Sequence, residues 1–415
     1  MKVLAYTSPA RGHLTPMMGP LLELRDRGAE VHVRTLAAGV DNVRAAGLEA
    51  EPIAPAIEAV AHDDHEARVQ LTSGARSFRT LRRRAKHEVP DFEAALAAVE
   101  PDLVLVDSTT FGAKAVAERE GLRWAVSQPS FIEEEAADGT PFGLGLLPRG
   151  GAIGRLRDRS LGVLGSHFDQ HHRLPAVNAG RRAAGLPELA RAAEFHHRAP
   201  LTIYYTATPL DYERRLPPSV VSVGPSLWDP AVAGPVDLPA GDRPLVLVGC
   251  SSEFQDDGAI AAAALAGLGD RHRVVVTTAG VDPESLGDPG DALVARYLPH
   301  VPIMRAADVV VCHGGMGITQ KALAFGVPVC VVPWGRDQLD VAAHVVACGA
   351  GTRVPRRKLT PARLAAAVDG ALGCGDGAAR VKEGFEAIGG IPRAADALEG
   401  LVAGAGPAGE AGARS

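Results

Sequence analysis

The sequence predicts an α/β protein built from two parallel-sheet units that face each other across a cleft. Three observations lead to this prediction: short apolar strands alternate with amphipathic helices in the first half, the same alternation begins again after residue 240, and a stretch rich in proline and glycine separates the two series. Unbroken apolar strands of this kind are typical of parallel sheets covered by helices on both faces. The 415 residues also exceed what one ordinary hydrophobic core accommodates.

The first series opens with a strand and a well-marked helix. The helix spans residues 14–28, carries Leu21, Leu22 and Leu24 on its buried face, and ends at Gly28, the residue type that favours the position after a helix. The other elements expected in this series are strands at 2–7, 30–36, 101–108 and 122–128 and a helix at 110–121. Strand and helix therefore alternate as a doubly wound sheet requires.

The second series repeats this alternation after a linker at 217–244, which lacks helical periodicity. Its expected strands lie at 243–252, 272–278, 307–315 and 327–333, and its helices at 257–269, 317–326 and 340–349. The predicted domains are 1–220, 221–380, a helical segment at 381–402 that packs back on the first domain, and a disordered tail at 403–415.

Composition limits the partners and the compartment. The net charge of −6 offers no basic field for nucleic acid or anionic lipid, and no apolar run reaches the roughly 18 residues of a membrane helix. The five cysteines are odd in number and lack CxxC spacing, so we expect reduced core residues in a cytoplasmic protein. We expect no nucleic-acid or membrane partner, and a monomer or homodimer.

Chemistry is expected where strands end, because open parallel sheets bind ligands beyond the carboxyl ends of their strands. Five short stretches follow such ends: "SPARGH", "DSTT", "CSSEFQ", "CHGGMG" and "PWGRDQ". They fall in both halves of the chain, which predicts a site between the two units.

Two of these stretches suit a diphosphate. "CHGGMGITQ" places His313 and free backbone N–H groups at a helix start, and "CSSEFQ" supplies the hydroxyls of Ser251 and Ser252. The alternative is a plain strand-to-helix turn. Neither G-x-G-x-x-G nor Walker spacing is present, so we do not expect a dinucleotide.

The remaining stretches carry a candidate base and a candidate sugar contact. His13 and Asp107 follow two strands of the first unit, and Asp107 would accept from one ring nitrogen while the other acts as a general base. Asp337 and Gln338 pair a carboxylate with an amide, which suits sugar hydroxyls, although Asp337 equally suits the first turn of a helix.

Three longer motifs resemble the family 1 nucleotide-sugar glycosyltransferases of GT-B fold, especially the actinomycete enzymes that glycosylate natural products. They are "ARGHLTP", "LVLVGCSS" and "YLPHVPIMRAADVVVCHGGMGITQKALAFGVPVCVVPWGRDQ". The resemblance implies an inverting transfer from a nucleotide-sugar donor to a hydroxyl of a small acceptor, with His13 as base, Asp107 as its supporting carboxylate, and no metal or other cofactor. It also implies a donor site made of Gly12, Ser251, Ser252, Leu298, His300, His313, Gly315, Met316, Gly317, Ile318, Trp334, Asp337 and Gln338.

Two positions leave the donor nucleotide open between UDP and dTDP. Ile318 replaces the Ser or Thr of many members, and Lys321 stands where others carry a glutamate that holds the ribose hydroxyls. A lysine cannot accept those hydrogen bonds. The role of Lys321 is therefore undetermined.

Two other functions are alternatives for the same architecture. A nucleotide-sugar epimerase of the same architecture would need carboxylates at the base position, and a non-catalytic nucleotide-binding activator of a partner transferase need not keep a base. The histidine-containing stretches 62–65 and 167–172 look polar and loop-like and lack zinc spacing, so we expect no metal there. The acceptor is expected to contact the loops at 55–90 and 130–175.

Overall fold

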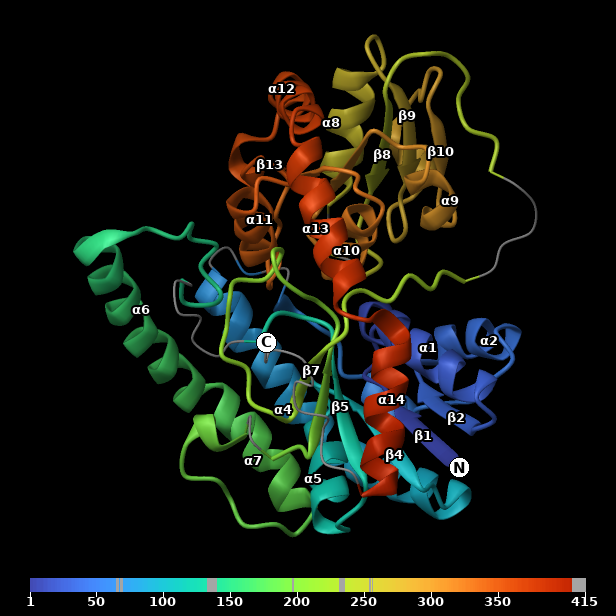
Figure 1. Cartoon of the computed structure of the whole chain (residues 1–415), viewed down its shortest axis with the longest axis vertical. Coiled ribbons are helices and arrows are strands. Elements are labelled where there is room, and N and C mark those ends of the chain that lie inside the picture. Colours follow the sequence, from blue (N-terminus) through green and yellow to red (C-terminus); the bar gives the residue numbers. More distant parts are fainter. Residues whose placement is uncertain are drawn as a thin grey trace, which may run out of the picture.

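The computed structural model describes residues 1–64, 67, 70–132, 140–195, 198–230, 236–253, 255 and 257–404. Its two halves each contain one sheet, and every strand pairing is parallel (Figure 1). The predicted α/β class with two parallel-sheet units is confirmed. Within the described residues, no helix is long and apolar enough to span a membrane.

The first half forms a sheet of seven strands with helices packed around it. Its strands are β1 Lys2–Tyr6, β2 Glu30–Thr35, β3 Glu49–Pro52, β4 Leu103–Asp107, β5 Trp124–Gln128, β6 Leu201–Tyr204 and β7 Val220–Ser222. Its helices are α1 Arg11–Asp26, α2 Ala37–Ala45, α3 Pro55–Glu58, α4 Gln70–Val99, α5 Phe111–Arg119, α6 Gly151–His171 and α7 Arg173–Ala183. The strand order is β3-β2-β1-β4-β5-β6-β7, so the sheet extends two residues past the expected boundary at residue 220, because β7 pairs with β6.

The second half forms a sheet of six strands in the order β10-β9-β8-β11-β12-β13. The bounds are β8 Leu245–Gly249, β9 Arg273–Thr277, β10 Leu293–Ala295, β11 Val309–Cys312, β12 Val329–Val331 and β13 Gly351–Arg353. The helices are α8 Gly258–Leu268, α9 His300–Met304, α10 Met316–Ala324, α11 Gln338–Ala347, α12 Pro361–Leu372 and α13 Gly375–Ala387. Every residue of β8, β11 and β12 is buried, because helices cover both faces of these strands.

The last helix, α14 Gly390–Ala403, returns to the first half and lies beside α1 (Figure 1). Its buried residues Ala394, Ala395 and Leu398 join the core beneath the first sheet. Arg27 reinforces the contact by bonding to Asp396 at 2.6 Å and to Glu399 at 2.8 Å. The chain therefore crosses between its halves twice. Residues 405–415 of the expected disordered tail lie outside the described residues.

The two halves also share an apolar core. Phe131 after β5, and Ala207 and Leu210 after β6, pack among the strand and helix residues of the second half. The carboxyl edge of the first sheet is thus held against the second unit.

One stretch expected to be a loop is helical. Residues 167–171 lie in the last turns of α6, which projects from the body in Figure 1. Gly154 is the only buried residue of this helix, and its apolar residues Ile153, Leu156, Val163 and Leu164 are exposed. Among the described residues, no group of His, Cys, Asp or Glu is arranged to hold a metal ion.

Candidate active site

Both sheets reverse their strand order at the same relative position. β1 lies beside β4 in the first sheet and β8 beside β11 in the second, and the chain leaves these neighbours in opposite directions. A crevice forms at such a switch point beyond the carboxyl ends of the strands. His13 and Asp107 occupy this position in one half, and Ser251 and His313 occupy it in the other.

His13 lies in the first turn of α1, because the helix begins at Arg11 rather than after the histidine as expected. Its Nδ1 lies 2.8 Å from Oδ1 of Asp107, the last residue of β4. Backbone N–H groups fix that carboxylate: Ser8 donates to Oδ2 at 2.9 Å and Thr109 donates to Oδ1 at 2.9 Å. A carboxylate can only accept here, so Nδ1 carries the proton and Nε2 keeps its lone pair when the ring is neutral.

Opposing effects set the pKa of both groups. Burial alone would lower the pKa of His13, but the Asp107 carboxylate and its hydrogen bond leave that pKa above its ordinary value of 6.5. Burial alone would raise the pKa of Asp107, and His13 with the Ser8 and Thr109 donors holds it well below its usual range. Asp107 is therefore ionised throughout the neutral range.

The second half contributes charge to the same place. Glu253 accepts from the backbone N–H of Arg11 at 3.3 Å, one of the contacts that cross between the halves. Glu253 and Asp337 both act electrostatically to raise the pKa of His13. The candidate base and the second unit thus face each other.

His313 follows β11 and sits under the start of α10. A Cβ on Gly315 would collide with the imidazole, and Gly314 has φ +91°, so both glycines are needed for the ring to take this position. The ring is 8% exposed, and its Nδ1 has no hydrogen-bond partner among the described residues. Burial lowers the pKa of His313, which keeps it neutral. A buried nitrogen at a helix N-terminus suits a polar ligand.

The amides that follow His313 belong to the first turn of α10, where no earlier carbonyl can accept from them. Gly315 is the N-cap, has extended backbone, and as a glycine has no side chain that could cap the helix. Met316, Gly317 and Ile318 follow in the helix, as expected, and the Ile318 side chain packs against Gly249 of β8. These free N–H groups face the end of the strand where His313 lies.

The serines after β8 differ in accessibility. Ser251 is buried, its N–H donates to Asp257 at 2.7 Å, and its hydroxyl accepts from Glu253 N–H at 3.2 Å. Ser252 is exposed. The loop is therefore held by its own hydrogen bonds, and only the Ser252 hydroxyl points freely to solvent.

Lys321, on α10, has a partner that the sequence did not indicate. Its ammonium bonds to Asp229 and to the carbonyl of Trp228, both in the linker. Asp229 also accepts from Val301 N–H at 2.9 Å. The linker thereby delivers a carboxylate close to α9, where sequence analysis found none.

His300 and Leu298 lie beside this carboxylate. His300 Nε2 is 3.0 Å from the Thr277 hydroxyl, and burial lowers its pKa to about 4, with Asp229 opposing and Lys321 adding to the shift. Leu298 is partly buried and packs against the apolar core that the two halves share. Their predicted contact with a nucleobase stays a prediction.

Asp337 and Gln338 play different parts at the start of α11. Asp337 occupies the N-cap position at the start of α11, as the alternative interpretation expected, but its side chain makes no capping hydrogen bond. Gln338 accepts from Trp334 N–H at 2.8 Å and donates to Gln255 at 2.9 Å, which commits its amide to the loop. The Asp337 carboxylate is therefore the group that remains available to a ligand. The Arg356 guanidinium lies over the Trp334 ring, with its Cζ 4.2 Å from the ring centroid.

The same loop is tied to the first half. Arg336 makes a paired contact with Asp64, at 2.7 Å and 3.2 Å, and its carbonyl accepts from Gln70. Asp340 accepts from the N–H groups of Gly143 and Gly145 at 2.7 Å and 3.0 Å. Hydrogen bonds with the first half therefore fix the loop and the helix start that carry Asp337.

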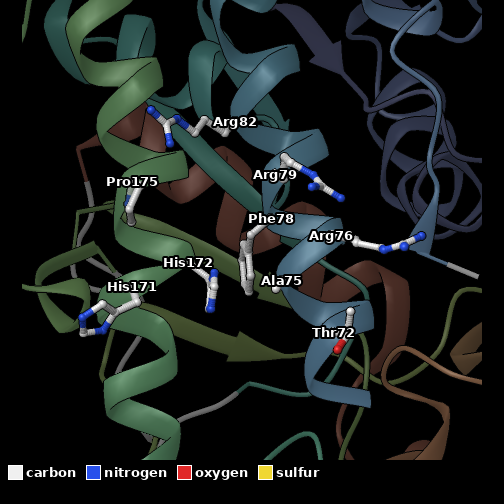
Figure 2. Close-up of a pocket in the computed structure, with 9 residues that line it drawn as sticks. All are labelled: Thr72, Ala75, Arg76, Phe78, Arg79, Arg82, His171, His172 and Pro175. Atoms are coloured by element: carbon white, nitrogen blue, oxygen red, sulfur yellow. The ribbon is translucent and has the colours of Figure 1, made fainter. Parts of the chain in front are cut away.

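Two hollows lie on the first unit. One of about 250 Å³ begins at Ser108 and Thr109, the residues after Asp107, and continues between β5, β6 and the helices α4, α5 and α7. The other, of about 530 Å³, lies between α4 and the α6–α7 junction (Figure 2). Phe78 lines both hollows. The inner hollow includes residues of the expected acceptor loops, but also Lys114, Arg181 and Phe195, which sequence analysis missed.

Known proteins resemble the chain along its length. The family described as "Erythromycin biosynthesis protein CIII-like, C-terminal domain" matches residues 263–384. A 4'-demethylrebeccamycin synthase of Lentzea aerocolonigenes is 30% identical over 421 residues, covering 97% of this chain and 99% of that protein.

Two solved structures share the fold. One, described as the glycotransferase of kitacinnamycin, superposes with a TM-score of 0.74 at 23% identity, covering 97% of this chain and 99% of the other. The glycosyltransferase VinC, solved in complex with dTDP, gives a TM-score of 0.70 at 20% identity and covers 97% and 100% of the two chains. The fold of the two facing units is therefore GT-B.

Proposed function

The chain belongs to the GT-B glycosyltransferases of natural-product biosynthesis, and from that membership we propose that it transfers a sugar from a dTDP- or UDP-linked donor to a hydroxyl of a small natural-product acceptor, with inversion. The observation that carries the proposal is the 2.8 Å contact between His13 and Asp107, on which Glu253 and Asp337 of the second half also act. That neither a metal nor another cofactor takes part stays a prediction.

The proposed reaction is one direct displacement. Nε2 of His13 takes the proton of the acceptor hydroxyl while its oxygen attacks the anomeric carbon. The bond from that carbon to the phosphate oxygen breaks, and the electron pair leaves with the diphosphate. Attack from the side opposite the leaving group inverts the anomeric configuration.

Each half has one task in this step. Asp107 keeps the proton on Nδ1 and stabilises the imidazolium that forms, so it positions the base without touching substrate. His313 and the first amides of α10 bind the leaving diphosphate, whose negative charge the helix N-terminus favours. Asp337 accepts hydrogen bonds from hydroxyls of the sugar.

The test is the variant His13→Ala, assayed with dTDP-glucose and UDP-glucose against a panel of hydroxylated aromatic and macrocyclic acceptors. Loss of a general base should lower the rate by about 10²- to 10⁴-fold. Calorimetry with dTDP and UDP serves as control, since His13 lies in the other half from the diphosphate site and nucleotide affinity should persist. Transfer at the wild-type rate in His13→Ala would remove the base from the proposal.

A further inference from the structure

The inner hollow offers a chemically defined surface beside the candidate base. Ser108 and Thr109 are among the residues that line it, and Thr109 N–H donates to Asp107 at 2.9 Å. Aromatic rings make up much of the remaining wall, contributed by Phe78, Phe111, Trp124, Phe131 and Phe195. A volume of about 250 Å³ with such walls suits a planar ring system of two or three fused rings.

Lys114, on the first turn of α5, places a cation in this wall. The residue is 5% exposed, and its ammonium donates to the Ser108 carbonyl. The rings of Phe195 and Phe111 flank it, with centroids 4.1 Å and 4.8 Å away. Within the described part of the chain, no carboxylate lies within salt-bridge distance of this ammonium.

The other cations of the wall differ in this respect. Arg181 and Arg198 both pair with Glu118, at 2.7 Å and 2.9 Å, and Arg173 lies 3.3 Å from Asp169. A buried ammonium without a counter-charge costs several kcal/mol. Lys114 is thus the cation of this wall that is left for a ligand.

Neither neighbouring carboxylate neutralises Lys114. Asp107 is committed to His13 and its backbone donors. Burial raises the pKa of Glu88 to about 8, so this group is mostly protonated at neutral pH. Burial lowers the pKa of Lys114 to about 7, with Arg173 adding to the shift and Asp107 and Glu88 opposing it. A ligand anion would restore the charged form of the lysine.

The outer hollow favours the same kind of ligand. In Figure 2, Arg82 reaches from α4 toward the facing helix, and His172, at the α6–α7 junction, lies near Phe78, whereas Arg76 and Arg79 extend from α4 to the other side. Asp63 offsets part of this charge, since it lies 3.2 Å from Arg79 and 3.9 Å from Arg76. A positive surface next to the cavity attracts anions to it.

We propose that Lys114 binds a carboxylate of the acceptor, and that the acceptor class is therefore the aromatic hydroxy acids. Such a molecule places its ring system between the aromatic side chains, its carboxylate on Lys114 and its hydroxyl toward His13. The assignment of the hydroxyl rests on the proposed function, whereas recognition of the carboxylate does not.

The experiment is calorimetry of the full chain with 6-hydroxy-2-naphthoate and with its methyl ester, which has the same ring and hydroxyl but no charge. The wild type should bind the acid at least about tenfold more tightly than the ester, the range of one charge-assisted hydrogen bond. Lys114→Met should abolish this preference while changing ester affinity less than about twofold. The matched control is Arg198→Met, a cation of the same wall that pairs with Glu118, and it should keep the preference.

Several results overturn the proposal. Equal binding of acid and ester to the wild type does so whatever the variants show, as does failure of the acid to bind at all. A Lys114→Met variant that loses acid and ester affinity in equal measure gives the lysine a structural role only. Binding needs no sugar donor, so a retained acid preference without any sugar transfer would contradict the proposed function and leave this inference standing.

Discussion

At the scale of single residues, His13 is balanced between a buried setting that favours the neutral ring and a carboxylate that favours the imidazolium. Its side chain keeps 26% of its surface exposed, while Asp107 keeps 1%. His13 is therefore accessible from solvent, whereas Asp107, which raises the pKa of His13, is not. A base acts only when neutral, so the rate should rise with pH through a pKa above 6.5.

The variant Asp107→Asn tests this tuning. Removing the carboxylate takes away the main effect that raises the pKa of His13, so the acid limb of kcat/KM should move to lower pH. The maximal rate should fall as well, since the imidazolium loses its stabilising charge. A pH–rate profile measures both effects. An unmoved acid limb would show that Asp107 does not set the pKa.

The residues of the candidate site were predictable to different degrees. His13, Asp107 and His313 stand at strand ends within recognisable motifs, so their placement at the switch points follows from the order of strands. Asp229 was not predictable, because it meets Lys321 across 92 positions of sequence and lies in a linker without periodicity. Local patterns encode strand ends, whereas a contact over that distance depends on the whole fold.

At the scale of elements, the long helix α4 and the helix α5 approach so closely that only a glycine fits between them. A methyl group at Gly112 would overlap the Ala85 carbonyl and lie 2.8 Å from Glu88 Cβ. The backbone N–H of Gly112 also donates to the Glu88 carboxyl group, at 2.7 Å. This contact sets the position of α5, and with it the position of Lys114.

Gly112→Ala should therefore destabilise the protein by about 1–3 kcal/mol, as overpacking of a close contact does. Unfolding in urea, followed by circular dichroism, measures the change. The matched control is Gly162→Ala on α6, where a methyl group meets nothing within 4 Å. That change should stabilise by up to about 1 kcal/mol, because alanine is the better helix former. Equal effects of the two substitutions would contradict the close-contact argument.

The elements that sequence analysis found and missed differ in burial and length. Strands such as β1, β4 and β8 have five residues each and are almost wholly buried, so their apolar runs identify them. β7, β10 and β13 have three residues each and are only partly buried, so they lack the apolar run that identified the equally short but fully buried β12. The helix α6 was missed for a different reason, since only its polar end at 167–171 was considered, while its apolar residues such as Ile153 and Leu156 lie exposed in the structure.

At the scale of the whole molecule, one histidine joins the halves. His344 of α11 is stacked between Phe131 and Tyr212 of the first half, with ring centroids 3.9 Å and 3.7 Å away. Its Nδ1 donates to the Leu210 carbonyl at 3.0 Å. Burial lowers the pKa of His344 to about 3, so the folded protein holds it neutral.

Acid should weaken this junction. The unfolded chain protonates His344 near pH 6.5, whereas the folded chain does so only near pH 3, so the stability it contributes is complete above pH 6.5 and declines as the pH falls toward 3. Between pH 8 and pH 5 the wild type should lose about 2 kcal/mol relative to His344→Gln, which cannot titrate. Urea unfolding of both proteins at several pH values measures the difference. Parallel pH curves for the two would exclude His344 as the cause.

The return of α14 to the first half has a consequence for exchanging the second half between related proteins. A hybrid cut once, in the linker, would carry a foreign α14 and would lose the fit of Leu398 and the Arg27 contacts. A second junction at Gly389, which has positive φ and precedes α14, would leave the native α14 in place. The segment to exchange therefore lies between the linker and Gly389 and needs two junctions, although the second half follows the first in the sequence.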